Sequence, residues 1–188
     1  MIRRRSLLIT GLAALAAPSL IAVRANAFAL DPRFVPQDVR FTEVYGPGHL
    51  VVVPRAHFLY FVTAPGEARR YGVGVGRAGL EFNGTAVIGA KKKWPTWRPT
   101  DEMIARDPRA YARFIDNEYV QPGGPDNPLG SRALYLFQNG RDTYYRIHGT
   151  NEPQSIGRSV SNGCIRMINE HVQELYERVP VGTVVTVL

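Results

Sequence analysis

A series of short strands separated by turn residues is the feature that most limits what this chain can fold into. The strands follow one another with only short turns between many of them, and they do not alternate with long helices. Asn139-Gly140, between two of the strands, is a strong hairpin signal. The sequence therefore predicts a mainly β fold, a β-sandwich or barrel-like sheet with small flanking helices. The expected strands, rich in β-branched and aromatic residues, cover residues 50–53, 57–62, 69–75, 84–90, 132–137, 143–148 and 181–188.

Two short helical segments are expected on the flank of this sheet. Thr100 precedes two acidic residues, as at a helix N-terminus, and Asp107 begins a second turn as a capping residue followed by proline. Asn169 is expected to cap a helix over residues 170–178, where apolar side chains recur at helical spacing. The proline- and glycine-rich segment 122–128 is predicted to be an ordered loop near a functional edge, or a long connection.

The first 27 residues contain the three regions of an export signal. Basic residues occupy positions 3–5, an almost uncharged apolar run covers residues 7–23, and small residues at positions 25–27 offer a site at which a signal peptidase cuts. Arg4 and Arg5, followed by a serine and two leucines, also resemble the twin-arginine export pattern. The alternative is an uncleaved anchor, since about 17 residues is the lower limit for crossing a bilayer.

Removal of the signal leaves a mildly basic domain. The whole chain has 23 basic and 16 acidic residues, a net charge of +7. Four of the arginines lie in the signal, so 19 basic and 16 acidic residues remain, a net charge of +3 that argues against a nucleic-acid partner. We expect residues 1–27 to be the signal, residues 28–44 a lead-in segment and residues 45–188 one domain, with membrane contact only through an uncleaved signal.

Two short motifs favour structural roles over ligand binding. The glycines at positions 72, 74 and 76 lack the spacing of a dinucleotide-binding loop and are better explained as one face of a strand. Basic and aromatic residues from Lys91 to Arg98 are typical of single-stranded nucleic-acid binders or of sites for acidic or glycan ligands, but a solvated charge run explains them better. The single cysteine excludes an intrachain disulfide and a cysteine-based zinc cluster, and no metal is expected.

One histidine and the single cysteine supply the candidate chemistry. His148 ends an expected strand, and Cys164 follows sixteen positions later. The thiolate is the reactive form of cysteine, and an unperturbed thiol, with a pKa of about 8.5, is only a few per cent ionised at neutral pH. Pairing with imidazole would lower that pKa, provided that an acceptor such as a backbone carbonyl holds the other ring nitrogen. A buried inert thiol and an unrelated histidine are the alternatives.

The residue before the cysteine completes the pattern. Gly163 permits a turn that aims successive backbone N–H groups at a developing oxyanion. A lone unpaired cysteine is also unusual in an exported chain, which favours a reactive thiol. Together these residues predict nucleophilic catalysis at Cys164.

The His148-Gly-Thr150 segment and the loop Ser161-Asn-Gly-Cys164-Ile-Arg166 together resemble the signature of the L,D-transpeptidase catalytic domain family, of the YkuD or ErfK/YbiS type. Members of that family carry a His-Gly-Thr strand end and a Ser-His-Gly-Cys-x-Arg loop. The resemblance covers roughly residues 45–188, including the segments 71–76, 94–97, 122–125, 127–130 and 180–183. It implies a mainly β enzyme of the bacterial envelope or periplasm that uses no cofactor.

The resemblance further implies acyl transfer on peptidoglycan stem peptides. Cys164 would attack the carbonyl of the third residue, commonly diaminopimelate, and release the terminal D-alanine as a thioester forms. His148, oriented by the carbonyl of Gly149, would activate the thiol and later shuttle the proton of the incoming amine. Carbapenems, which imitate the scissile acyl group, should then acylate the cysteine. The remaining positions implied for oxyanion or substrate contacts are Ser161, Asn162, Gly163 and Arg166.

Two of these positions carry open alternatives. Arg166 would either bind a substrate carboxylate or brace the loop. Asn162 stands where the family loop commonly has histidine, and an asparagine cannot take a proton at neutral pH. Because the resemblance assigns the base to His148, we expect an active enzyme with altered oxyanion or substrate contacts.

The acceptor is also open at this point. The amine would belong to another stem peptide or to a lysine of an outer-membrane protein. Water as the acceptor would make the protein an L,D-carboxypeptidase. A non-catalytic peptidoglycan-binding domain with a vestigial Cys164 is the alternative from another class, and a thiol of low pKa would argue against it.

Overall fold

The computed structural model describes residues 28–42 and 44–188. The predicted export signal, residues 1–27, lies outside the described residues. Strands dominate the described chain, which confirms the predicted mainly β fold with small flanking helices. Within this part of the chain, no helix is both long and apolar enough to cross a membrane.

Nine strands form one mixed sheet in the order β1-β4-β3-β2-β11-β6-β7-β8-β10. These strands are β1 (Gln37–Arg40), β2 (Leu50–Val53), β3 (Phe58–Ala64), β4 (Glu67–Gly72), β6 (Gly84–Lys93), β7 (Arg132–Gln138), β8 (Arg141–His148), β10 (Ile165–Arg166) and β11 (Val184–Val187). The pairs β2–β11 and β8–β10 are parallel, and the other neighbouring pairs are antiparallel. Two further strands, β5 (Val75–Gly76) and β9 (Ser159–Ser161), pair in parallel with each other.

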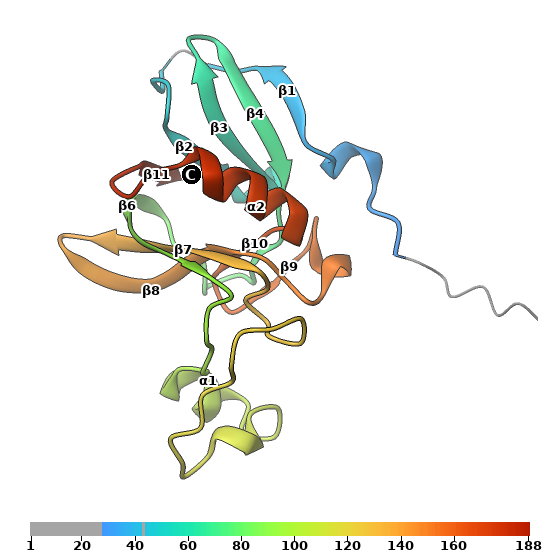
Figure 1. The fold of residues 1–188 in the computed structure, drawn as a ribbon, viewed down its shortest axis with the longest axis vertical. Coiled ribbons are helices and arrows are strands. Elements are labelled where there is room, and N and C mark those ends of the chain that lie inside the picture. Colours follow the sequence, from blue (N-terminus) through green and yellow to red (C-terminus); the bar gives the residue numbers. More distant parts are fainter. Residues whose placement is uncertain (1–27, 43) are drawn as a thin grey trace, which may run out of the picture.

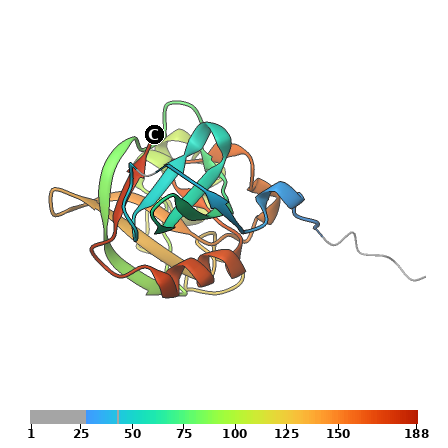
Figure 2. The same cartoon turned by 90° about the horizontal axis from the view of Figure 1, so that it is seen from above.

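The sheet bends around a single apolar core. Figure 1 shows β2, β3 and β4 on one side of helix α2 (Asn169–Arg178) and β6, β7 and β8 on the other, and Figure 2 shows β6 curving along one side of the molecule. The apolar stripe predicted on α2 is buried in this core through Val172, Leu175 and Tyr176. Burial of such a stripe, more than intrinsic propensity, stabilises a helix of this length.

The segment 28–44, expected as a lead-in, contributes a strand to the sheet. Strand β1 pairs with β4, and Val39 lies opposite Ala68. Only one of the four β1 residues is apolar, and three of the four are exposed. Because an edge strand of this kind has no hydrophobic alternation, its sequence carries no strand signal.

Asn169 does not cap α2, so that expectation is wrong. Ile168 occupies the N-cap position, and Asn169 is the first helical residue. The Asn169 side chain accepts a hydrogen bond from Ser131 N–H at 3.0 Å and donates one to the Thr150 carbonyl at 3.0 Å. The amide oxygen and nitrogen of Asn169, which could have capped the helix, are therefore used in tertiary hydrogen bonds.

Residues 94–131, which join β6 to β7, form a lobe that extends from the sheet and carries helix α1 (Asp101–Arg106), as Figure 1 shows. Thr100 caps α1 by accepting a hydrogen bond from Met103 N–H. Asp107 accepts one from Ala110 N–H, but this turn leads only into a 3-10 helix, Ala112–Phe114. A small aromatic cluster holds the lobe together, with Trp97 packed edge-on against Phe114 at 5.2 Å.

The proline- and glycine-rich segment 122–128 is ordered by one buried amide. Asn127 donates hydrogen bonds to the carbonyls of Pro95 and Pro122 and accepts one from Leu129 N–H. Lys91, the first residue of the basic run, donates to the carbonyls of Tyr176 and Val179 at the end of α2. Cations stabilise the C-terminal end of a helix, so this lysine has a structural role.

Candidate active site

A cavity of about 1100 Å³ separates the lobe from the end of β8, and both Cys164 and His148 line it. The lobe supplies one wall through Trp97, Arg106 and Tyr111, among other residues. The opposite wall comes from β8 and from the loop that carries the cysteine. The two residues expected to perform the chemistry therefore share one solvent-accessible cavity.

Strand pairing places these residues on one face of the sheet. Ile165 pairs in parallel with Ile147, and Arg166 pairs with His148. The two isoleucines belong to the core, so their neighbours in sequence point to the opposite face, toward the cavity. Cys164 precedes β10 on this same cavity-facing side.

His148 is a buried neutral imidazole with a defined tautomer. Its side chain is 4 % exposed, and Nδ1 lies 2.5 Å from the Gly149 carbonyl oxygen, the partner implied by the family resemblance. Burial lowers the pKa of His148 to about 4, although the Gly149 carbonyl opposes this shift. Because a carbonyl only accepts, Nδ1 carries the proton in the neutral ring, which leaves the lone pair on Nε2.

Cys164 is half-buried and is not hydrogen-bonded to His148 within the described residues. Its Sγ instead lies 3.9 Å from the carbonyl oxygen of Tyr144. Burial raises the pKa of the thiol, while the backbone N–H of Arg146 and the positive charges of two arginines oppose the increase. The expectation of a lowered pKa is therefore wrong for this structure, because desolvation outweighs these effects and no imidazole pairs with the thiol.

Ser161 braces the turn that carries the nucleophile. Its buried hydroxyl accepts a hydrogen bond from Gly163 N–H at 3.1 Å and donates one to the Cys164 carbonyl at 2.6 Å. Of the two N–H groups expected at an oxyanion site, that of Gly163 is thus already used. No loop or turn hydrogen bond within the described residues uses the N–H of Cys164.

Gly163 is required by both its backbone conformation and its surroundings. Its φ of +117° lies in a region that side chains disfavour. A Cβ atom there would approach the Leu80 carbonyl oxygen and the Tyr145 ring to 2.5 Å. Gly76 also packs closely against this loop, since its Cβ would lie 2.9 Å from the Gly163 Cα. This contact gives Gly76 a structural role. Gly72 ends β4, Gly76 lies in β5 and Gly74 lies between the two strands, so the three glycines do not form one face of a single strand as expected.

Asn162 joins the nucleophile loop to the lobe. Its Oδ1 accepts hydrogen bonds from Arg77 at 2.7 Å and from Arg106 at 3.0 Å. Its Nδ2 donates to the Tyr111 hydroxyl at 3.1 Å. The amide therefore holds three segments together at the cavity wall and is not placed as a proton carrier.

Arg166 braces a neighbouring loop. Its guanidinium pairs with Glu152 at 2.6 Å, and its backbone forms two hydrogen bonds with Gly74. The guanidinium is largely buried, with an exposed fraction of 18 %. Of the two roles considered from sequence, bracing the loop is the one that these contacts support.

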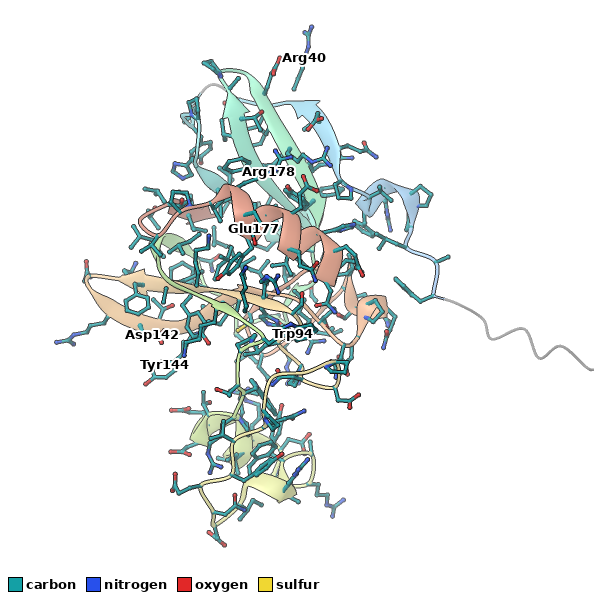
Figure 3. All side chains as sticks on the ribbon, in the orientation of Figure 1. Arg40, Trp94, Asp142, Tyr144, Glu177 and Arg178 are labelled. Carbon is teal, nitrogen blue, oxygen red and sulfur yellow. The ribbon has the colours of Figure 1, made fainter. Side chains whose placement is uncertain are left out.

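Sequence reasoning missed the bulge at Tyr144. Tyr144 has a φ of +62° and an exposed fraction of 71 %, and Figure 3 shows it projecting from β8 on the side of the sheet from which the lobe extends. Asp142 accepts its N–H at 2.8 Å and binds the Arg146 guanidinium through both carboxylate oxygens. An Asp two residues before the bulge is a local turn signal that could have indicated this conformation.

The family model and the curated relatives that this chain matches all name L,D-transpeptidases. Residues 47–187 match the L,D-transpeptidase catalytic domain family YkuD. The chain is 37% identical over 151 residues to "Probable L,D-transpeptidase YbiS" of Escherichia coli K12, covering 79% of this chain and 47% of that protein. It is 34% identical over 157 residues to "Probable L,D-transpeptidase ErfK/SrfK" of the same organism, covering 82% and 48%. The chain thus spans about half the length of these curated relatives.

Solved structures share the fold. A crystal structure from Brucella melitensis, described as a probable carnitine operon oxidoreductase caia, is 58% identical, covers 82% of this chain and 93% of its own, and gives a TM-score of 0.57. That description names a different enzyme class from the sequence relatives. The avibactam carbamoyl enzyme of Ldtfm is 17% identical, with a TM-score of 0.52 over 74% of this chain and 48% of its own, and shows likeness of fold alone.

Proposed function

Because this chain belongs to the L,D-transpeptidase catalytic domain family, we propose that it is a cysteine acyltransferase acting on peptidoglycan stem peptides. The observation that carries the proposal is the neutral His148, whose Nδ1 is held by the Gly149 carbonyl in the same cavity as Cys164. A non-catalytic binding module would have no need for a buried imidazole with a free lone pair beside a partly accessible thiol.

The first half-reaction forms a thioester. Sγ of Cys164 attacks the carbonyl carbon of the third stem residue, and the thiol proton passes to Nε2 of His148. The tetrahedral intermediate then collapses with cleavage of the amide bond to D-alanine. The proton on Nε2 goes to the leaving amine nitrogen, so D-alanine departs as a neutral amine and His148 is neutral again.

The second half-reaction uses the same groups in reverse. An incoming amine attacks the thioester carbonyl and gives a proton to Nε2 of His148. The C–S bond then breaks as the new amide forms, and His148 returns the proton to Sγ of Cys164. The acceptor is the amine of a second stem peptide or a lysine of an outer-membrane protein, and water in its place would give an L,D-carboxypeptidase. All three outcomes share the thioester.

Cys164 and His148 are both uncharged in the free enzyme, and this determines the step at which the thiol loses its proton. Burial raises the pKa of Cys164 and lowers that of His148, so both groups are uncharged near pH 7. Proton transfer therefore accompanies attack on a bound substrate and does not precede it. The N–H of Cys164, which no loop or turn hydrogen bond uses among the described residues, supports an oxyanion site at the nucleophile itself, where one donor is typically worth about 3 kcal/mol.

The proposed setting is the bacterial envelope. Residues 1–27 are proposed to direct export, with the twin-arginine pattern as the route, so that the domain acts in the periplasm. The curated relatives are named as L,D-transpeptidases, which supports a peptidoglycan substrate.

Mass spectrometry of the intact protein tests the proposal directly. Residues 28–188 are mixed with a purified stem tetrapeptide, and the mass should rise by that of the tripeptide acyl group with one D-alanine released. A carbapenem should form one adduct on the same residue. Cys164→Ala should show neither product, whereas acylation at another residue, or no acylation of the native protein, would contradict the mechanism.

A further inference from the structure

Four arginines line the cavity, and three of them are already engaged. Arg98 donates to two backbone carbonyls of the lobe, at 2.7 and 2.9 Å. Arg146 and Arg166 pair with carboxylates of their own, Asp142 and Glu152. Among the described residues, the fourth arginine, Arg106, has no such backbone carbonyl or carboxylate partner.

Arg106 has no carboxylate partner within residues 28–42 and 44–188. Its guanidinium donates a single side-chain hydrogen bond, to the neutral Oδ1 of Asn162, and Arg77 donates to the same oxygen. Two positive charges thus converge on one uncharged acceptor at the cavity wall. An anion arriving beside Asn162 would form hydrogen bonds in which donor and acceptor are both charged, which are stronger than those to the neutral amide oxygen.

Helix α1 presents an opposite charge one turn before Arg106. Glu102 also lines the cavity, four positions earlier on the same face of the helix, yet the two side chains form no salt bridge. Hydrogen bonds from its own backbone and from Thr100 are the main causes that lower the pKa of Glu102, and the Arg106 charge adds to them, so the carboxylate is ionised. The helix therefore offers an anionic and a cationic group side by side.

This pair is complementary to the end of an amino acid that carries both an ammonium and a carboxylate. Building on the proposed function, we infer that Arg106 and Glu102 select an acyl donor whose third residue ends in such a zwitterion, as the side chain of diaminopimelate does. Arg106 binds the carboxylate, and Glu102 binds the ammonium. A lysine side chain at that position supplies only the ammonium.

The reach of the substrate agrees with this assignment. Two residues of chain span at most about 7 Å, and the Arg106 guanidinium donates to Asn162 Oδ1 at 3.0 Å, so it lies within about 14 Å of the Cys164 Cα. Six bonds separate the reacting carbonyl of diaminopimelate from its distal carboxylate, about 8 Å when extended at bond lengths of about 1.5 Å. The carboxylate of the leaving D-alanine lies only three bonds away, about 4 Å, so the distal carboxylate of diaminopimelate extends about twice as far from the reacting carbonyl.

Asn162 makes this arrangement possible. An amide oxygen has two lone pairs and can accept from both arginines, whereas a neutral imidazole offers one acceptor nitrogen. The histidine common at this position in the family could hold only one of the two guanidinium groups. Asparagine in place of the family's histidine thus allows a second guanidinium group to bind at this position.

The test compares tetrapeptides that differ only at the third residue: diaminopimelate, diaminopimelate with its distal carboxylate amidated, and lysine. Thioester formation and D-alanine release give kcat/KM for each. The native protein should prefer the first peptide over the amidated one by ten- to hundredfold, the range for one hydrogen bond to a charged group. Arg106→Gln should reduce this preference to less than threefold. Glu102→Gln should slow the diaminopimelate and lysine peptides alike.

Arg109→Gln is the matched control, because it removes the same charge from the same lobe at a residue that does not line the cavity. It should keep the full preference. Asn162→Asp, which offers the arginines a competing carboxylate, should weaken turnover of the diaminopimelate peptide more than of the amidated one. Equal rates for all peptides with the native protein, or an Arg106→Gln protein that still discriminates, would overturn the inference alone. Failure of every peptide to acylate Cys164 would overturn the proposed function as well.

Discussion

The Cys164 thiol lies 3.9 Å from the carbonyl oxygen of Tyr144, so a backbone carbonyl, and not the imidazole of His148, is its hydrogen-bond partner among the described residues. An acceptor at this position favours the protonated thiol. The bulge that places the carbonyl is fixed by Asp142, which accepts the Tyr144 N–H at 2.8 Å. In the free enzyme, the nucleophile Cys164 is therefore a protonated thiol.

Alkylation by iodoacetamide should report this state. Only the thiolate reacts, and burial raises the pKa of Cys164 above its ordinary range. The second-order rate constant should therefore climb about tenfold per pH unit from pH 6 to pH 8 and bend only above about pH 8.5. The denatured protein serves as the reference for an unperturbed thiol. A rate that is already level between pH 6 and pH 7 would show a thiolate–imidazolium pair instead.

Tyr144 should tolerate glycine better than alanine. Both substitutions remove the ring, but only glycine adopts a φ of +62° without cost, and the left-handed region costs other residues roughly 1–2 kcal/mol. In urea titrations Tyr144→Ala should thus be less stable than Tyr144→Gly by about 1 kcal/mol. Equal stability of the two variants, or the reverse order, would mean that the bulge relaxes and that its backbone conformation is not needed.

Acid should destabilise the protein through His148. The pKa of this histidine is about 4 in the folded protein and about 6.5 when unfolded, so the unfolded chain binds more protons between these values. Stability therefore falls as the pH drops from about 6.5 to about 4. The loss between pH 7.5 and pH 4.5 should exceed that of His148→Gln by about 2 to 3 kcal/mol in urea unfolding. Parallel losses would place the imidazole in solvent.

His148 should also be needed for turnover. Removing a general acid–base group typically costs two to four orders of magnitude, so His148→Ala should lower kcat for thioester formation by about 10²- to 10⁴-fold. The measurement is D-alanine release from the stem tetrapeptide across pH 5 to 9. Nearly native turnover with an unchanged pH profile would require another base.

Ser161→Ala should destabilise the nucleophile turn. The change leaves the Gly163 N–H without its acceptor and the Cys164 carbonyl without its donor in a buried position, which costs about 1–3 kcal/mol. Ser159→Ala, two residues earlier on β9, is the control, since its exposed hydroxyl has a single side-chain partner, His57 Nε2 at 3.0 Å, and its loss should cost less than about 1 kcal/mol. Similar losses for both variants would contradict a bracing role for Ser161.

The parts of the fold that could be predicted from sequence are those with local or periodic signals. The Asn139-Gly140 hairpin is observed, with both residues at positive φ (52° and 73°), and β7 and β8 pair on either side of it. The stripe on α2 is buried as expected because one face of a helix repeats along the sequence. Strand β1 and the side-chain contacts of Asn169 lack such signals.

The features of the candidate site also fall into those that could be predicted from sequence and those that could not. Cys164, His148 and Gly149 could be named because they lie in short motifs. The contacts of Asn162 join residues 51 to 85 positions apart in the chain, and only the tertiary fold brings them together. The raised pKa of Cys164 likewise depends on burial, which a spacing of sixteen residues does not reveal.

Asn162 provides the sharpest test of where the base lies. Because its amide links Arg77, Arg106 and Tyr111 to the nucleophile loop, histidine at this position should lose one arginine contact without gaining a catalytic role. We expect Asn162→His to change kcat/KM on a stem tetrapeptide by less than about tenfold, or about 1.4 kcal/mol. Asn162→Ala, which removes all three hydrogen bonds, should be the more harmful change. A gain above a hundredfold on introducing histidine would instead show that the base belongs at position 162 and that His148 has been assigned the wrong role.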